Sequence, residues 1–430
     1  MFMPRIASGC LFVVLLVNSG LIENRLNAQE DETGDKQPPF VEKFLINGEL
    51  DAGEQQLQTK LAAQPGDDQT RFELGILQFF QTVEHLAQNM YDLGQEQNIG
   101  LGFVPFMRMP IPHNHDPDEV KLEDVKKAFS DMVDDLKKTK ETLGKIKSSD
   151  VNARLHPFKI RLDFDNDGKA DSEARTHELF VTYLGVRQRA NQDFKKIAID
   201  FDRADAEWML GYCHLLSAMC ETILAYDQTE LWDTIAHRIF QKAIVKHDFF
   251  LEEKKKENPR WNSPGFYVYF ADFVAAIRHC HFKIKEPERL KKAHAHLLSM
   301  IKHSRQMWVL IEKETDKQNE WIPSPSQSNP FARQNITREM TRSWDVFLNE
   351  SEAILKGEKL IPFWRGTNPK RGVNLHKVFH APQDLDLVDC IQGPGMIPFL
   401  QEGECTDPQT WIELQRTFRG NFVGFAIWIN

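Results

Sequence analysis

The sequence predicts a mainly α fold: a helical body, bundle-like or solenoid-like, that carries one EF-hand-type loop and ends in a C-terminal cap. Three observations lead to this prediction. Apolar side chains recur with the period of a helix through most of residues 41–356. Aspartates alternate in the short segment 163–171. Residues 357–430 are instead rich in Gly and Pro with short apolar runs, which predicts an irregular or small α+β cap.

The N-terminus has the parts of a secretory signal peptide, predicted at residues 1–28. An early arginine precedes a short apolar run at 10–17, and the small residue Ala28 comes just before an acidic stretch. Cleavage after Ser19 and an uncleaved anchor are the alternatives, although a bilayer span needs about 20 apolar residues. Residues 29–40 are predicted to form a flexible lead-in. We therefore expect an exported protein, periplasmic or secreted, with no membrane span after signal cleavage.

The composition is that of a globular protein with an acidic balance. Hydrophobic residues make up 41% and charged residues 27%, and 53 Lys and Arg stand against 63 Asp and Glu, for a net charge of −10. This balance argues against a nucleic acid as partner. Loss of Cys10 with the signal leaves five of the 6 cysteines, too few for a disulfide scaffold. We expect buried free thiols, with Cys390 and Cys405 as the one sequence-local pair considered.

The helical period predicts a series of amphipathic helices that turn-forming residues separate. The first two, at 50–63 and 70–90, are separated by Pro65-Gly-Asp-Asp68, and this start, 50–93, resembles a tetratricopeptide repeat unit. Residues 96–120 contain many Gly and Pro and are expected to be extended. Further helices are predicted at 121–147, 172–195, 204–226, 229–248, 265–284, 287–316 and 337–356.

The clearest chemical signal is the string Asp163-Phe-Asp165-Asn-Asp167-Gly168-Lys169-Ala-Asp171. Alternating carboxylates with Gly at the sixth place are typical of the first half of an EF-hand calcium loop. A hard dication takes six to eight oxygens, and Asp at every second place lets a tight turn bring three carboxylates together. Lys169 is expected to offer its backbone carbonyl, and Asp171 a direct or water-mediated oxygen.

The loop, 163–174, departs from the EF-hand pattern at two places. The twelfth place, usually a bidentate Glu, is Ala174, with Glu173 one residue before it. The eighth place is Ala170 rather than the larger apolar residue that pairs two hands, and no second loop is found. We predict one structural Ca²⁺ held by Asp163, Asp165, Asp167, Lys169, Asp171 and Glu173. The alternative is a hydrated aspartate cluster that caps the following helix.

A second polar pattern lies on two of the predicted helices. Glu207, His214 and Glu221 share one face of helix 204–226 with several small residues, and helix 265–284 carries Asp272 and His279. If these two helices faced each other, the five side chains could form an acid–base or metal centre. The alternatives are a buried hydrogen-bond network that sets helix packing and a solvated helix edge.

Other histidine pairs and catalytic motifs contribute less. His113 and His115 lie in a Pro-rich loop, where solvation is expected rather than metal binding. His294 and His296 are two residues apart on a predicted helix, so their side chains do not face each other. The sequence contains no Gly-x-Ser-x-Gly, His-Glu-x-x-His, phosphate-loop or dinucleotide motif.

Several strings together resemble an uncharacterised family of exported bacterial proteins with an Asp-x-Asp-x-Asp-Gly loop. They are Arg108-Met-Pro-Ile-Pro112, Ile160-Arg-Leu-Asp-Phe-Asp-Asn-Asp-Gly-Lys169, Asp200-Phe-Asp-Arg-Ala-Asp-Ala-Glu-Trp208, Gly211-Tyr-Cys-His214, Leu224-Ala-Tyr-Asp227, Leu360-Ile-Pro-Phe-Trp-Arg365 and Phe422-Val-Gly-Phe-Ala-Ile-Trp-Ile-Asn430. The resemblance extends over most of the mature chain. It implies an exported protein, and it assigns no catalytic residues because the family has no assigned chemistry.

Two functions of different classes are consistent with these patterns. The first is a non-enzymatic binding or scaffold protein of the cell envelope, whose partner is an unknown protein or polymer there. The second is a hydrolase or lyase that acts on an envelope or extracellular polymer through Glu207, His214, Glu221, Asp272 and His279. Convergence of these five side chains in an open cleft favours the enzyme, whereas dispersal between helices favours the scaffold.

Overall fold

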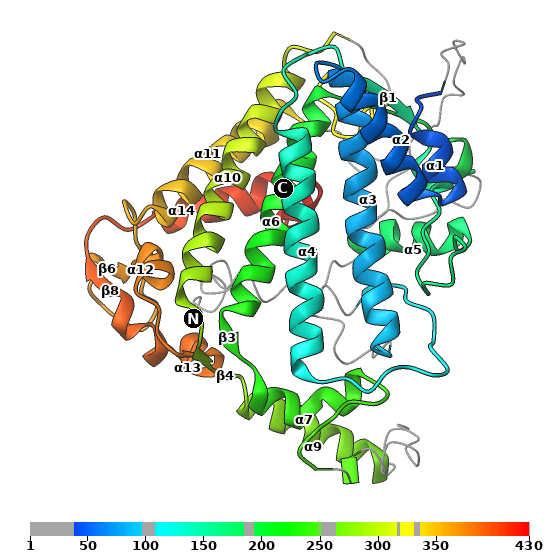
Figure 1. The fold of residues 1–430 in the computed structure, drawn as a ribbon. Helices are drawn as coiled ribbons and strands as arrows, with labels where there is room; N and C mark the ends of the chain where they lie inside the picture. The colour runs from blue at the N-terminus through cyan, green and yellow to red at the C-terminus, as the bar shows by residue number, and fades with distance from the viewer. Residues whose placement is uncertain are drawn as a thin grey trace.

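The protein is mainly helical, as the sequence predicts, with small antiparallel sheets between and beyond the helices (Figure 1). The computed structural model describes residues 38–96, 108–184, 193–247, 249–250, 264–315, 319–330 and 336–429. The predicted signal peptide and most of the lead-in lie outside these ranges, so both stay predictions. Within the described ranges, none of the helices combines the length and the hydrophobicity that crossing a bilayer requires.

The chain starts with short helix α1 (Glu42–Asn47) and a hairpin of α2 (Leu50–Ala63) and α3 (Asp68–Asp92). The Asp67 side chain accepts a hydrogen bond from the Thr70 amide and so satisfies one free N–H at the start of α3. Helix α4 (Leu122–Leu143) then packs against α3. The resemblance of residues 50–93 to a tetratricopeptide unit stays a prediction, since α2 and α3 form a single hairpin.

Four long helices form the centre of the body. In the order α3, α4, α6 (Arg203–Leu224) and α10 (Pro287–Ile311), each packs against the next (Figure 1). Helix α6 is largely buried because it lies between α4 and α10, and Asp202 caps its first turn through the Ala204 and Asp205 amides. One continuous apolar core, with Leu77, Leu136 and Cys213 among its members, joins these helices.

Three predicted helices are shorter than the sequence pattern indicates. Residues 172–195 form α5 (Glu173–Leu184) and, beyond residues outside the described ranges, the 3₁₀ turn η5 (Phe194–Lys196). Residues 229–248 form α7 (Thr229–Ile239), which ends where Phe240 becomes extended and pairs with Gln95. Residues 265–284 form α9 (Pro264–Arg278) and strand β4 (His281–Ile284). Helices α7 and α9 end where the chain pairs with remote backbone, and local periodicity does not report such pairing.

Short strands join distant parts of the body. Strand β1 (Asn152–Leu155) pairs antiparallel with β2 (Ile199–Asp202), after which α6 starts directly. Strand β3 (Tyr226–Asp227) pairs with β4, and β4 also pairs with β7 (Leu385–Asp386). The segment before the aspartate loop contains the 3₁₀ turn η4 (Pro157–Lys159). Of residues 96–120, which are expected to be extended, 97–107 lie outside the described ranges and 109–120 are non-helical.

The C-terminal cap follows α11 (Arg338–Leu355) and is a small α+β unit, as predicted. Its elements are β5 (Ile361–Pro362), β6 (Arg371–Val373), α12 (Leu375–His380), β7, α13 (Leu387–Gln392), η6 (Pro394–Phe399), β8 (Leu400–Glu402), α14 (Pro408–Thr417) and α15 (Phe422–Ile429). Strands β5, β6 and β8 form an antiparallel sheet. Phe422 and Phe425 of α15 contact the buried Trp344 of α11, which holds the cap on the body.

The cysteines of the described residues are free thiols. Cys213, Cys220 and Cys390 are buried, whereas Cys280 and Cys405 are partly exposed. Burial raises the pKa of Cys213 and Cys220 to about 12, so neither side chain is a thiolate near neutral pH. The expectation of free thiols is confirmed, although only three of the five are fully buried.

A glycine sets how closely α3 approaches α4. A Cβ added to Gly75 would lie 2.2 Å from Leu143 Cδ2 and 2.6 Å from Leu143 Cγ. We expect Gly75→Ala to lower the free energy of unfolding by about 1–3 kcal/mol in urea titrations, because overpacking outweighs the gain in helix propensity. Gly66→Ala is the matched control, since a Cβ there meets nothing within 4 Å. Equal stability of both variants would contradict this close packing.

Candidate metal centre

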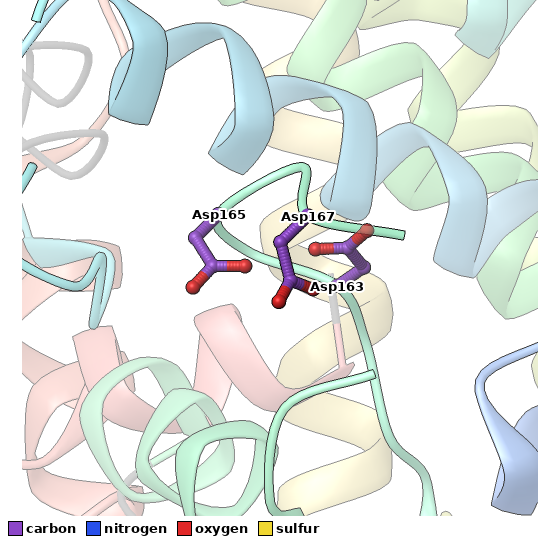
Figure 2. Close-up of side chains that lie close together, drawn as sticks. All are labelled: Asp163, Asp165 and Asp167. Atoms are coloured by element: carbon purple, nitrogen blue, oxygen red, sulfur yellow. The ribbon is translucent and has the colours of Figure 1, made fainter. Parts of the chain in front are cut away.

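Three carboxylates gather at one turn of the aspartate loop (Figure 2). One oxygen each of Asp163, Asp165 and Asp167 lies within 4.8 Å of the others. In the part of the chain that the structure describes, this is the only group of three or more His, Cys, Asp or Glu side chains that comes so close. Together these side chains could hold a metal ion.

Backbone hydrogen bonds to the carboxylates shape the turn. The Gly168 amide donates to Asp163 Oδ2 at 3.0 Å, and the Lys169 amide donates to Asp167 Oδ1 at 2.8 Å. Asn166 and Gly168 have φ of 57° and 77°, in the left-handed region that Asn and Gly tolerate best. No atom lies within 4 Å of the place for a Gly168 Cβ, so backbone conformation rather than space favours Gly here.

Helix α3 holds the loop from the side through residues that sequence reasoning missed. Glu84 Oε2 accepts a hydrogen bond from the Asp163 amide at 2.7 Å, and Gln88 Nε2 donates to the Asp163 carbonyl at 3.0 Å. Asp92 is hydrogen-bonded to the Asn166 side chain. These three residues are four apart, so they share one face of α3. A polar stripe of this spacing was the signal that could have found them.

The loop concentrates negative charge where part of it is shielded from water. Burial, and then the charges of Asp171 and Asp167, raise the pKa of Asp165. Burial raises the pKa of Glu84 to about 7, and the charge of Asp163 adds to this effect. Asp163 is only 8% exposed, and its Oδ1 has no hydrogen-bond partner. A buried carboxylate oxygen without a partner is unfavourable unless a cation or a proton neutralises it.

The side chains of the other predicted ligands are engaged by different partners. Asp171 Oδ2 accepts from the Phe164 amide at 3.1 Å, and its Oδ1 accepts from Arg175 Nε at 3.0 Å. Glu173 forms an ion pair with Lys195, which lowers the pKa of Glu173. Lys169 Nζ lies 4.0 Å from Asp167 Oδ2, and its side chain is exposed. Glu173 therefore does not take the place of the missing twelfth ligand in this structure.

Ala170, at the eighth place, packs against the end of α1 instead of a second hand. A Cβ on Gly48 would lie 2.0 Å from Ala170 Cβ, so both residues must be small. Arg161 donates to the carbonyls of Ala170 and Asp171 at 2.7 and 2.9 Å. The loop thus contacts α1 and α3, which explains how a single EF-hand-type loop is supported without a partner loop.

The polar face of α6 is paired with α10 rather than with α9. His303 Nδ1 lies 2.5 Å from Glu207 Oε2, His214 Nδ1 lies 2.8 Å from His296 Nδ1, and Arg289 donates to Glu221 at 2.7 Å. Glu207, His214 and Glu221 are seven apart on α6, and so are their partners on the antiparallel α10. We call these six residues the polar ladder. Although burial raises the pKa of Glu207, its hydrogen bond to His303 and its ion pair with Arg203 hold that pKa below the ordinary value.

The remaining two candidates pair on the other side of the body. Asp272 of α9 accepts from Arg238 Nε of α7 at 2.7 Å and lies 3.2 Å from His237 Nε2. His279 Nδ1 lies 3.4 Å from Glu230 Oε2, also of α7. The structure therefore does not bring Glu207, His214, Glu221, Asp272 and His279 together. Helix α9 packs on α7, where Asp272 pairs with Arg238 and His237.

Comparisons of the chain with models of known protein families, with curated proteins and with solved structures found no match in any of the three. The family resemblance drawn from the sequence stays a prediction.

From the polar ladder we expect the folded protein to lose stability in mild acid. Burial, followed by the charge of Lys140, lowers the pKa of His214 to about 3 and that of His296 to about 4. The unfolded chain protonates these groups near pH 6.5, so it binds more protons than the fold and stability falls with pH below that value. Between pH 7 and 5 we expect the free energy of unfolding to drop more in the wild type than in His214→Gln/His296→Gln, by about 2 kcal/mol for each fully shielded histidine and so by about 2–4 kcal/mol for this partly exposed pair.

Urea titrations of both proteins at the two pH values measure this difference. The charged or titratable groups that face the pair are Lys140 of α4 and Lys292, Lys302 and His303 of α10. They are unchanged in the variant and serve as its internal control. Parallel pH dependence of wild type and variant would refute the assignment.

Proposed function

We propose that the aspartate loop binds one Ca²⁺ and that the ion has a structural role. The observation that carries this proposal is the buried Oδ1 of Asp163, which has no hydrogen-bond partner and belongs to the group formed with Asp165 and Asp167. A Ca²⁺ there offsets most of the charge of the three carboxylates, in a loop that Glu84 and Gln88 already tie to α3. Oxygen ligands from carboxylates are those that Ca²⁺ prefers.

The affinity is expected in the weak extracellular range. Without a bidentate twelfth ligand, a Kd of about 10⁻⁴–10⁻³ M is typical of such sites. The Lys169 carbonyl and Asp171, directly or through water, are the remaining ligands we propose. At ten times Kd, binding stabilises the fold by about 1.4 kcal/mol, which suits a site that holds a turn in place.

We propose further that the protein is an exported binding or scaffold protein of the cell envelope without catalytic activity. The N-terminal signal pattern and the family resemblance support export. The pairing of each acid or histidine candidate with its own neighbour supports a structural role for these side chains. The partner is a protein or polymer of the envelope.

The alternative is a hydrolase or lyase that acts on such a polymer. It needs an acid–base pair that reaches a substrate. Glu207 and Glu221 are nearly fully buried between α6 and α10, and their oxygens are already paired with cationic or histidine side chains. This arrangement favours the binding or scaffold function over the enzyme.

Calcium titration tests the proposed site. We expect calorimetry to detect one weak Ca²⁺ site in the wild type and none in Asp163→Asn, because the amide removes the central charge. Thermal unfolding adds a second measurement: millimolar Ca²⁺ should raise the Tm of the wild type and leave that of the variant unchanged.

Two further variants sharpen this test. Asp150→Asn changes an exposed aspartate outside the loop, so it should bind Ca²⁺ like the wild type. Glu173→Gln should also leave the affinity within about twofold, since Glu173 is paired with Lys195 rather than facing the three aspartates. A wild type that takes up no Ca²⁺ would remove the proposed role, and tenfold weaker binding by Glu173→Gln would instead make Glu173 a ligand.

A further inference from the structure

Three histidines from two helices meet where the cap contacts the body. Helix α10 contributes His294, and the short helix α12 contributes His376 and His380. The ring centre of His294 lies 5.3 Å from that of His376 and 4.8 Å from that of His380. His376 and His380 stack in parallel, with ring centres 4.0 Å apart. None of these three residues belongs to the aspartate loop or to the polar ladder.

The hydrogen bonds of His294 determine which of its nitrogens carries the proton. His294 Nε2 lies 2.9 Å from the Leu355 carbonyl oxygen, which can only accept, so Nε2 must carry the proton. In the neutral ring, Nδ1 then presents a lone pair, and it faces His380 Nε2 at 3.1 Å. A histidine that donates one N–H to a backbone carbonyl and offers the other nitrogen is the usual arrangement of a metal ligand.

The spacing of these two nitrogens fits a tetrahedral ion. Zinc–nitrogen bonds of about 2.0–2.1 Å at tetrahedral angles place two ligand nitrogens about 3.3 Å apart. The distance from His294 Nδ1 to His380 Nε2 is 3.1 Å. His294 is buried at 6% exposure, whereas His380 is exposed, so an ion can enter from the solvent side.

His376 is placed to supply the third nitrogen. It lies four residues before His380, the spacing at which two histidines on one helix bind the same ion. In the structure its ring stacks on His380, and the three nitrogens do not yet converge as the oxygens of the aspartate loop do. A rotation of the His376 side chain off this stack is therefore part of binding.

We propose that His294, His376 and His380 form a Zn²⁺ site between α10 and α12, separate from the aspartate loop. Zinc accepts imidazole nitrogens readily, whereas Ca²⁺ prefers oxygen, so the two sites take different ions. Three protein ligands leave one coordination position for water or for a group from a partner.

The electrostatic surroundings distinguish this cluster from the other close histidine pair. Burial lowers the pKa of His294, which favours the neutral ring that metals bind, and slight desolvation and the neighbouring histidine rings disfavour a proton on the exposed His380 as well, so its pKa is also lowered. The charged groups near His380 are Lys291 and Glu288, of opposite sign. His214 and His296 instead face Lys140, whose positive charge opposes a second cation.

Zinc titration of the full chain without a polyhistidine tag tests the proposal. Asp163→Asn serves as the background, so that the aspartate loop does not contribute. We expect calorimetry to show one Zn²⁺ per chain, and we expect His376→Gln and His380→Gln each to weaken binding at least tenfold. Visible absorption of bound Co²⁺ should change in parallel, since it reports the nitrogen ligands directly.

His296→Gln is the matched control, because it removes a histidine two residues from His294 on another face of α10. It should bind Zn²⁺ within twofold of the background protein. Circular dichroism checks the fold of each variant, and His380 is the decisive position because its exposed side chain can change without unfolding the protein. No Zn²⁺ binding by the background protein, or unchanged binding by His380→Gln, would overturn the proposal.

Discussion

The antiparallel contact of α6 with α10 is the constraint on which the rest of the structure depends. Residues seven apart lie on nearly the same face of a helix, and both helices carry a polar residue at this spacing. Only one register therefore pairs Glu207 with His303, His214 with His296 and Glu221 with Arg289. A slip of one turn would leave buried charges unpaired, at a cost of several kcal/mol.

This register positions both candidate metal sites. The Lys140 side chain of α4 donates a hydrogen bond to Ser217 of α6 at 2.7 Å, and α4 packs on α6. Helix α3 in turn packs on α4. Helix α3 then supplies the residues that hold the aspartate loop. On another face of α10, His294 meets α12 of the cap. The two sites therefore lie at opposite ends of the series α3, α4, α6 and α10, and they share no ligand.

Local pattern predicted what depends on neighbouring residues. The aspartates and Gly168 are adjacent in sequence, so the loop and its turn could be recognised, and the apolar period located most helices of the body. The early ends of α7 and α9 were missed, because Phe240 pairs with Gln95 and β4 pairs with β3 and β7. The support of the loop by Glu84 was missed for the same reason, since 79 residues separate Glu84 from Asp163.

By itself, the sequence determined the mainly α class, the aspartate loop and the polar face of α6, because each depends only on the spacing of residues along one helix or turn. Only the tertiary structure decided which helices and side chains face each other. It paired that polar face with α10 instead of α9, turned Glu173 toward Lys195, and placed His294 beside two histidines of the cap. The physical reason is that partner choice depends on burying charge and apolar surface across the whole fold, and no local period encodes it.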